Sequence, residues 1–463
     1  MRNKEERTIG RKVTTKISGF SEMRTAHIHS PVPFFFMLLL LLSSLLAGPV
    51  SAGELKLQDL IDEAMKSNPE ILSASANLSA SKYRIPQVKS LPDPMFMFGY
   101  KNEGFKRYTY GDSPDAKWMY TLSETFPFPG KLPLKGEIAS KESESIEASY
   151  KDVKLRIIER IKALYYELFL AFKNIDLLDE KSALFSQVEN AAIARYSTGK
   201  GSQQEVLMAQ TEKYLILEKK EMYQQTIQSL QAMLNAAVGR QAGSPLERPS
   251  EPQTSGITYG MEQLMLLAFE KSPGIQSKWK LVTSAEKKVL LAKKQYYPDF
   301  TVSVGYEERK NFEDMWSLTT AINIPLFYKT KQRQGVLEAE ANLSGARNEF
   351  ESIKLMISSA IRDNYSMLVT AEKLMELYKS GLIPKSYQDF DLALSGYRTG
   401  SVDALTAITR LKSIIDLESS YWGQFIEREK AIARLEAITG IAVKNEQQGN
   451  NLFNGETVAS QRF

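Results

Sequence analysis

The chain has 463 residues, 25% of them charged, and a formal net charge of +4. It contains no cysteine, and its two histidines are His27 and His29. Beyond residue 29 the sequence therefore lacks the side chains of Ser-His-Asp triads, cysteine nucleophiles, His/Cys zinc sites and disulfides. The remaining carboxylates, lysines and tyrosines show no pair set apart from helical surface patterning, so we expect no enzymatic activity, no cofactor and no metal site.

The N-terminal segment has the pattern of a secretory signal. An apolar run over residues 34–46 follows basic residues, and small residues at Val50 and Ala52 fit a cleavage site. The run is too short to span a bilayer as a helix. We expect a signal peptide over residues 1–52, with Met23 as an alternative start that would give a more ordinary signal length.

Removal of this segment changes the charge balance. Residues 1–52 hold seven Lys or Arg and three Asp or Glu, which leaves 52 bases and 52 acids in the remaining chain. A neutral chain gives no electrostatic reason to expect a nucleic-acid partner. Because there is no cysteine, a lipid-anchored N-terminus is excluded.

The remaining chain contains the same pattern twice, about two hundred residues apart. Leu91-Pro92-Asp93-Pro94 recurs as Tyr297-Pro298-Asp299-Phe300, and Tyr196-Ser197-Thr198-Gly199 recurs as Tyr397-Arg398-Thr399-Gly400. A repeat of this size indicates one structural unit used twice around an axis. We expect a first repeat over 53–239, a linker over 240–256, a second repeat over 257–440 and a polar tail over 441–463.

Each repeat begins with helical periodicity. The first helix is expected over residues 57–90 with a break near Pro69, and its counterpart over 261–296 has Pro273 at the corresponding place. The repeated proline predicts a shared bend.

A β-hairpin follows in each repeat, at about residues 94–127 and 299–325. In the second copy, large apolar residues alternate with small polar ones with period two, which also fits a soluble sandwich. Aromatic residues near the strand ends favour a membrane interface: Tyr100, Trp118, Phe126, Tyr306 and Trp316. Four strands cannot close a useful barrel, and open edges in hydrocarbon leave backbone groups unpaired, so several chains must pool their strands.

Long heptad helices complete each repeat. They are expected at about residues 134–196 and 330–397, with returning helices to 238 and 438 after turns at Gly199 and Gly400. The apolar seam recurs every 3.5 residues, which predicts left-handed supercoiling. By itself this is an ordinary coiled-coil hairpin. Its duplication beside a membrane hairpin is unusual.

The two copies differ by one residue near the second turn. Heptad positions match at an offset of 200 residues, whereas the turn glycines match at 201, and Pro384 lies in the interval. Two interpretations remain open: a hinge at Pro384 that lets the second hairpin bend separately, or an inert proline bend.

This order of motifs resembles the TolC-type outer-membrane efflux protein family, the outer-membrane component of tripartite efflux or type I secretion systems. Besides the repeated motifs above, the resemblance rests on Glu124 to Lys131 at the strand exit and on Leu234-Asn235-x-x-Val238-Gly239 with its partner around Gly440. It implies a mixed α and β membrane protein: a homotrimer with a twelve-stranded outer-membrane β-barrel, continued by a periplasmic α-helical barrel. It also implies a periplasmic adaptor protein, an inner-membrane pump and outer-membrane lipid as partners.

The resemblance further implies a periplasmic gate near the helical turns. Tyr397 matches a latch tyrosine, and Gln204 and Glu205 stand where the first turn carries its polar latch. The family's paired aspartates fall on Thr406 and Thr409, and its latch arginine on Val402. Asp403 is the acid nearest to these positions, and it is either a displaced acidic ring or an ordinary acid at a helix start.

The favoured function is a passive channel for efflux of small molecules, metal ions or drugs, in the outer membrane of a Gram-negative bacterium. The alternative is a soluble periplasmic coiled-coil adaptor or scaffold, which would share the helices but would not need two aromatic-flanked hairpins.

Overall fold

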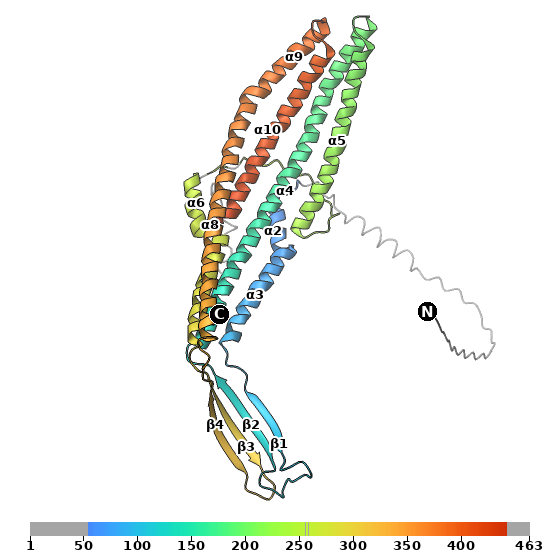
Figure 1. Cartoon of the computed structure of the whole chain (residues 1–463). Helices are drawn as coiled ribbons and strands as arrows, with labels where there is room; N and C mark the ends of the chain where they lie inside the picture. The colour runs from blue at the N-terminus through green and yellow to red at the C-terminus, as the bar shows by residue number, and fades with distance from the viewer. Residues whose placement is uncertain (1–53, 255, 258, 442–463) are drawn as a thin grey trace, which may run out of the picture. The chain divides into compact units, whose positions relative to one another are not determined.

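A computed structural model describes residues 54–254, 256–257 and 259–441. The predicted signal peptide and nearly all of the predicted tail lie outside the described residues. The described chain consists of helices and one four-stranded sheet (Figure 1). None of the helices in these ranges is long and apolar enough to cross a membrane.

Each repeat begins with two short helices separated by a single capping residue. The break that the sequence predicted near the prolines is present: Asn68 and Ser272 lie between the helices, and Pro69 and Pro273 occupy the first turn of the next one. The Asn68 side chain accepts hydrogen bonds from two backbone amides of that turn, Glu70 at 2.8 Å and Ile71 at 3.1 Å. The helices are α2 (Leu57–Ser67), α3 (Pro69–Lys89), α6 (Met261–Lys271) and α7 (Pro273–Lys294).

The long helices form two hairpins. At 1.5 Å per residue, the 67 residues of α4 extend over roughly 100 Å. Figure 1 shows the hairpin turns at one end of these helices and the strands at the other. The first hairpin is α4 (Lys131–Ser197) and α5 (Gln203–Val238); the second is α8 (Gln332–Glu376), α9 (Ile383–Thr399) and α10 (Ala404–Thr439).

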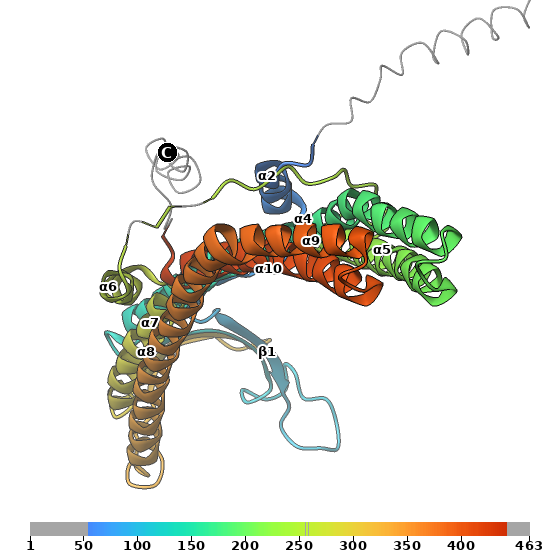
Figure 2. The same cartoon turned by 90° about the horizontal axis from the view of Figure 1, so that it is seen from above.

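The predicted heptad seam is the buried face of both long helices. In α4, Ile161, Leu168 and Leu178 are at most 2% exposed, and in α8 Ile361 and Leu368 are equally buried. The first seam packs with α2, α5 and α10, so one apolar core joins the two repeats. Figure 1 shows α10 lying between α9 and α4, and Figure 2 shows α7 beside α8 in the view from above.

The second long helix is not continuous, contrary to the single helix expected over 330–397. A π-helix, η1 (Leu377–Leu382), separates α8 from α9, and the Ile383 amide donates to the Tyr378 carbonyl, five residues earlier. An i→i+5 turn holds one residue more than an α turn. The π-helix therefore takes up the extra residue that the sequence comparison found between the repeats.

The four strands form one antiparallel sheet in the order β1-β2-β3-β4. The register places large apolar and aromatic residues on one face, with Leu122 opposite Val304, and small polar residues on the other, where Ser123 donates to Ser303 at 2.9 Å. Period-two alternation with hairpin pairing gives these two faces. The strands are β1 (Met95–Lys101), β2 (Lys117–Phe126), β3 (Phe300–Glu308) and β4 (Met315–Ile322).

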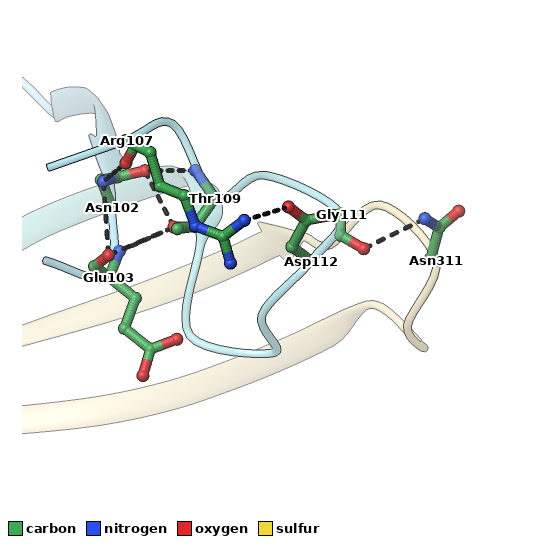
Figure 3. A network of polar contacts seen from close by, with 7 residues as sticks. All are labelled: Asn102, Glu103, Arg107, Thr109, Gly111, Asp112 and Asn311. Atoms are coloured by element: carbon green, nitrogen blue, oxygen red, sulfur yellow. Dashed lines mark hydrogen bonds and ion pairs between the residues drawn. The ribbon is translucent and has the colours of Figure 1, made fainter.

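The long loop between β1 and β2 is held together by one amide side chain. Asn102 donates from Nδ2 to the carbonyls of Gly104 and Arg107, both at 2.8 Å, and accepts at Oδ1 from the amide and hydroxyl of Thr109 (Figure 3). Asn311 in the loop between β3 and β4 donates to the carbonyl of Gly111 at 3.1 Å. The two loops are therefore joined beyond the sheet.

Candidate functional site: the helical tips

The two hairpin turns have the same backbone construction. Gly199 and Gly400 follow the ends of α4 and α9 with φ of 69° and 89°, in the left-handed region that favours glycine. The turns close with hydrogen bonds from the Lys200 amide to the Arg195 carbonyl, 2.8 Å, and from the Ser401 amide to the Gly396 carbonyl, 2.9 Å. Both turns therefore present the last residues of one helix to the first residues of the next.

A hydrogen bond connects the two turns. The Tyr397 hydroxyl, at the end of α9, donates to Oε2 of Glu205, in the first turn of α5, at 2.9 Å. Tyr397 is fully buried in a cluster that contains Phe390, Leu394 and Ile408. Burial, followed by the hydrogen bond to the Glu205 carboxylate, raises the pKa of Tyr397 to about 12. The phenol therefore remains a donor at any physiological pH.

Sequence reasoning missed Arg195, which joins the same group. Its Nη1 donates to the Tyr397 carbonyl at 3.1 Å and its Nη2 to the Lys200 carbonyl at 2.9 Å, while Nε lies 3.8 Å from Glu205 Oε2. The guanidinium carbon lies 5.2 Å from the centre of the Tyr397 ring, within cation–π range. One side chain thus contacts both turns. We call Arg195, Glu205 and Tyr397 the tip cluster.

A comparison of the repeats contains the signal that could have identified Arg195. At the offset of 201 residues, Arg195 corresponds to Gly396. A Cβ at Gly396 would lie 2.6 Å from Val402 Cγ2, so a long side chain does not fit there. Val402, at the position aligned with the family's latch arginine, has an apolar side chain. The cation near the turns is instead the guanidinium of Arg195, from the first hairpin.

The remaining gate candidates do not join the tip cluster. Asp403 is the N-cap of α10, where it accepts from the Thr406 amide at 2.7 Å. Hydrogen bonding from the Thr406 side chain, and then from its amide, holds the pKa of Asp403 below the usual range. Thr409 donates to a carbonyl of its own helix, and Gln204 is exposed. Within the single chain, Asp403 is thus an ordinary acid at a helix start, one of the two interpretations given for it. The other interpretation, a displaced acidic ring in an assembly, remains a prediction.

The hinge candidate Pro384 lies in the first turn of α9, directly after the π-helix. Near it, Lys181 of α4 is 2% exposed and its Nζ lies 3.2 Å from Glu418 of α10. Tyr387 of α9 donates to the other oxygen of Glu418 at 2.7 Å. Helix α9, directly after the π-helix, is therefore attached through Tyr387 to α10 by this hydrogen bond and to Lys181 of α4, whose Nζ lies 5.1 Å from the centre of the Tyr387 ring.

The predicted interface aromatics lie at the two ends of the sheet. Tyr100 is paired with Trp118, and Tyr306 with Trp316, at the end that carries the loops, whereas Phe126 pairs with Phe300 at the end next to the helices. Trp316 is 78% exposed and Tyr306 46%, so these rings are open to whatever surrounds the sheet.

No group of three or more His, Cys, Asp or Glu side chains is arranged to hold a metal ion in the described part of the chain. The tip cluster consists of hydrogen bonds and a cation–π contact that link side chains and backbone carbonyls of the two turns. These contacts hold the two helical hairpins together at their tips.

One family model and several solved structures are similar to the chain. A family model described as outer membrane efflux protein matches residues 264–409. No curated protein sequence is significantly similar to the chain.

Several solved structures share the fold. The outer membrane protein VceC from Vibrio cholerae is 20% identical, with a TM-score of 0.72 over 84% of this chain and 97% of that chain. The CmeC outer membrane channel of Campylobacter jejuni is 14% identical, with a TM-score of 0.68 over 84% and 87%. The open-state MtrE outer membrane channel of Neisseria gonorrhoeae is 15% identical, with a TM-score of 0.67 over 84% and 89%.

The family match lies in the second repeat, and the shared fold extends over both. The second repeat therefore matches the outer membrane efflux protein model, and the whole described chain has the fold of outer-membrane channels, in agreement with the resemblance of its motifs.

Proposed function

We propose that three copies of this chain form a passive outer-membrane channel for the efflux of small molecules, continued by a tunnel of helices through the periplasm. The observation that carries this proposal is the two-edged sheet. It has one apolar face and one polar face, and each outer strand lacks a partner strand along one edge within the residues described.

The apolar face is suited to lipid. Its residues are widely exposed in the single chain, with Phe96 at 65%, Leu318 at 64% and Ile322 at 58%. Leaving such a surface in water is unfavourable by about 25 cal/mol per Å². The opposite face carries Thr and Ser side chains that hydrogen-bond across strands, such as Thr125 with Thr301 at 3.0 Å, and it suits a water-filled lumen.

The two edges call for partners of the same kind. In hydrocarbon an unpaired backbone amide or carbonyl costs several kcal/mol, so a spanning sheet has to close. Three four-stranded sheets give a twelve-stranded barrel, an even-stranded size typical of outer-membrane proteins. The long helices continue from the strand ends, so the same three copies would enclose the periplasmic tunnel, with the tip cluster at its far end.

The channel has no chemistry of its own in this proposal. Energy would come from an inner-membrane pump, connected to the helical tips by a periplasmic adaptor protein. Metal ions and drugs are the proposed cargo. The family match favours this function over a soluble periplasmic adaptor, which would need neither the sheet nor its apolar face.

Membrane fractionation combined with electrical recording tests the proposal. The processed chain is expected in the outer-membrane fraction after a high-salt wash, to run as a trimer in mild detergent, and to conduct ions in planar bilayers. A chain that washes off with salt and runs as a monomer would instead be the adaptor. A strain that lacks the chain is expected to accumulate the pump's substrate, and the complementing gene should restore export.

A further inference from the structure

The contact between the two repeats within one chain provides a template for the contact between chains. Helix α7 packs against both α4 and α8, and β3 pairs with both β2 and β4. Among the described elements, α3 contacts only α2 and α4, and β1 pairs only with β2. The first repeat therefore lacks, on one side, the neighbour that the second repeat has.

The complementary side is open on α8. The first 25 residues of α4 include seven buried positions: Lys131, Gly136, Ile138, Ala139, Ser143, Ser145 and Ala148. In α8, by contrast, Ile357 is the first buried residue that the structure describes. An added Cβ at Gly335 or Gly345 would meet nothing within 4 Å. The start of α8 is thus open on the side that corresponds to the contact of α4 with α7.

The junction between sheet and helices shows what holds two repeats together. Lys131, 3% exposed, donates from Nζ to Asp299 Oδ1 at 2.8 Å and to the Tyr297 carbonyl at 3.0 Å. The same Asp299 oxygen accepts from the Phe128 amide at 2.7 Å. The strand exit of one repeat is therefore fastened to the residue that precedes β3.

The repeat supplies the same two groups at the outer edges. Asp93 corresponds to Asp299 in the repeated Pro-Asp motif, and Lys329 is placed after Ile324-Pro325 as Lys131 is placed after Phe126-Pro127. Both are exposed, and neither side chain makes a hydrogen bond or ion pair in the described portion of the chain. The Leu326 amide, at the position of Phe128, bonds only locally, to the Ile324 carbonyl.

A second pair follows from the helices. Lys287 of α7 pairs with Glu137 of α4 at 2.7 Å. Counted from the first proline of each helix, Pro273 and Pro69, Lys287 corresponds to Tyr83. Counted from the seam residues Ile161 and Ile361, Glu137 corresponds to Leu337. Tyr83 and Leu337 are 77% and 48% exposed. An ion pair inside the chain thus corresponds to two uncovered apolar side chains at its edges.

We propose that neighbouring copies repeat the contact between the two halves of one copy, so that Lys329 of one copy binds Asp93 of the next and Leu337 packs on Tyr83. The inference rests on the three-copy assembly proposed above and names its contact. Phe126 pairs with Phe300 within the chain, and their repeat equivalents are Ile324 and Pro94. The same register between copies places Ile324 opposite Pro94 of the next copy. Two residues further along the antiparallel pair, Ile322 lies opposite Phe96. This register keeps both side chains on the apolar face, as the assembly requires.

Cysteine cross-linking tests the register, and the chain has no cysteine of its own to interfere. Directly opposed residues in an antiparallel pair have Cα atoms about 4.5–5.5 Å apart, within disulfide range. The double variant Phe96→Cys/Ile322→Cys is expected to give covalent dimers and trimers that reductant dissociates. Its control, Phe96→Cys/Ala321→Cys, moves one cysteine to the opposite face and should stay unlinked.

Charge exchange tests the ion pair. Lys329→Asp is expected to lower the temperature at which the trimer dissociates, and adding Asp93→Lys should restore most of the loss. Lys331 makes a matched control, because it lines a cavity of about 380 Å³ together with Lys131, within its own chain. Loss caused by Lys331→Asp should not be restored by Asp93→Lys.

The outcomes separate the two proposals. A trimer in which the paired cysteines link no better than the control pair, or in which the charge exchange restores nothing, overturns the register while the assembly stands. A wild-type chain that is monomeric in detergent overturns both. Cross-linked trimers and restored stability support both.

Discussion

The hydroxyl of Tyr397 and the carboxylate of Glu205 join two helical turns that lie 192 residues apart in the chain. Glu205 belongs to the first hairpin and Tyr397 to the second. A hydrogen bond to a carboxylate contributes more than one between neutral groups, and this one is partly buried. Separation of the two hairpins at their tips must break it, so the bond favours the arrangement in which the tips are together.

Removal of this hydroxyl should loosen the tips. Tyr397→Phe keeps the packed ring and deletes a bond that contributes about 1.5–3 kcal/mol. We expect larger mean conductance of the purified channel in planar bilayers, with trimer yield unchanged. Tyr196→Phe is the matched control, since Tyr196 occupies the equivalent position in the first repeat and is 50% exposed. Equal conductance for both variants would show that the bond does not restrain the tips.

Replacement of Arg195 by lysine is expected to loosen the contact between the two helical tips. A lysine keeps the charge but cannot reach the carbonyls of Tyr397 and Lys200 at once, because it lacks the planar fork of guanidinium. Arg195→Lys should therefore raise conductance nearly as much as Arg195→Ala. Wild-type behaviour of the lysine variant would reduce the role of Arg195 to its charge.

The sequence was sufficient for the elements that depend on periodicity. The breaks at Pro69 and Pro273, the apolar seams and the alternating strands all follow from residue spacing, and the structure contains each of them. The π-helix was not foreseen, although the extra residue was. An insertion can be absorbed by a bend or by a wider turn, and the residue count alone does not distinguish between them.

The tip cluster could be predicted only in part. The resemblance gave Tyr397 and Glu205 separately as gate candidates near the two helical turns, and the structure adds a hydrogen bond between them. Arg195 had no motif, because its role depends on how two hairpins far apart in sequence pack together. Its correspondence with Gly396 shows that the two repeats have diverged at this position.

Acid should weaken the junction between sheet and helices. Partial burial of Asp299 acts to raise its pKa, but hydrogen bonds from Lys131 and the Phe128 amide outweigh it, and the pKa lies below its usual value of 3.8. A lowered pKa means that the stabilisation is fully present above this value and is lost as pH falls through the folded-state pKa. The temperature at which the trimer dissociates should therefore decrease when the pH is lowered below about 4.

Asp299→Asn provides the control for this pH dependence. It keeps an acceptor at the same place but cannot lose a charge, so its trimer should be less stable at neutral pH and should change less in acid. Identical acid profiles for both proteins would mean that other carboxylates cause the loss.

The buried Lys181 should be costly to remove alone. It is 2% exposed beside Glu418, and its loss leaves that carboxylate without its cation. Breaking such a buried pair costs about 3–5 kcal/mol, whereas replacing both partners with apolar residues is often neutral. Lys181→Met should lower the unfolding temperature strongly, and Lys181→Met/Glu418→Leu should recover much of it. A double variant no more stable than the single one would contradict this account.

Deletion of Gly381 should separate closure from opening. The π turn absorbs one residue, so its removal restores the residue count of an α-helix between α8 and α9 without turning α9 about its axis, and Pro384 then lies inside the joined helix. Tyr397 should stay beside Glu205, and conductance of the resting channel should match the wild type. If the π turn is where the second hairpin bends, export in cells should fall. Full export would show that the turn only accommodates an insertion. Deletion of Ser386, inside regular α9, is the control: it should rotate the tip by about 100° and disrupt the tip cluster itself.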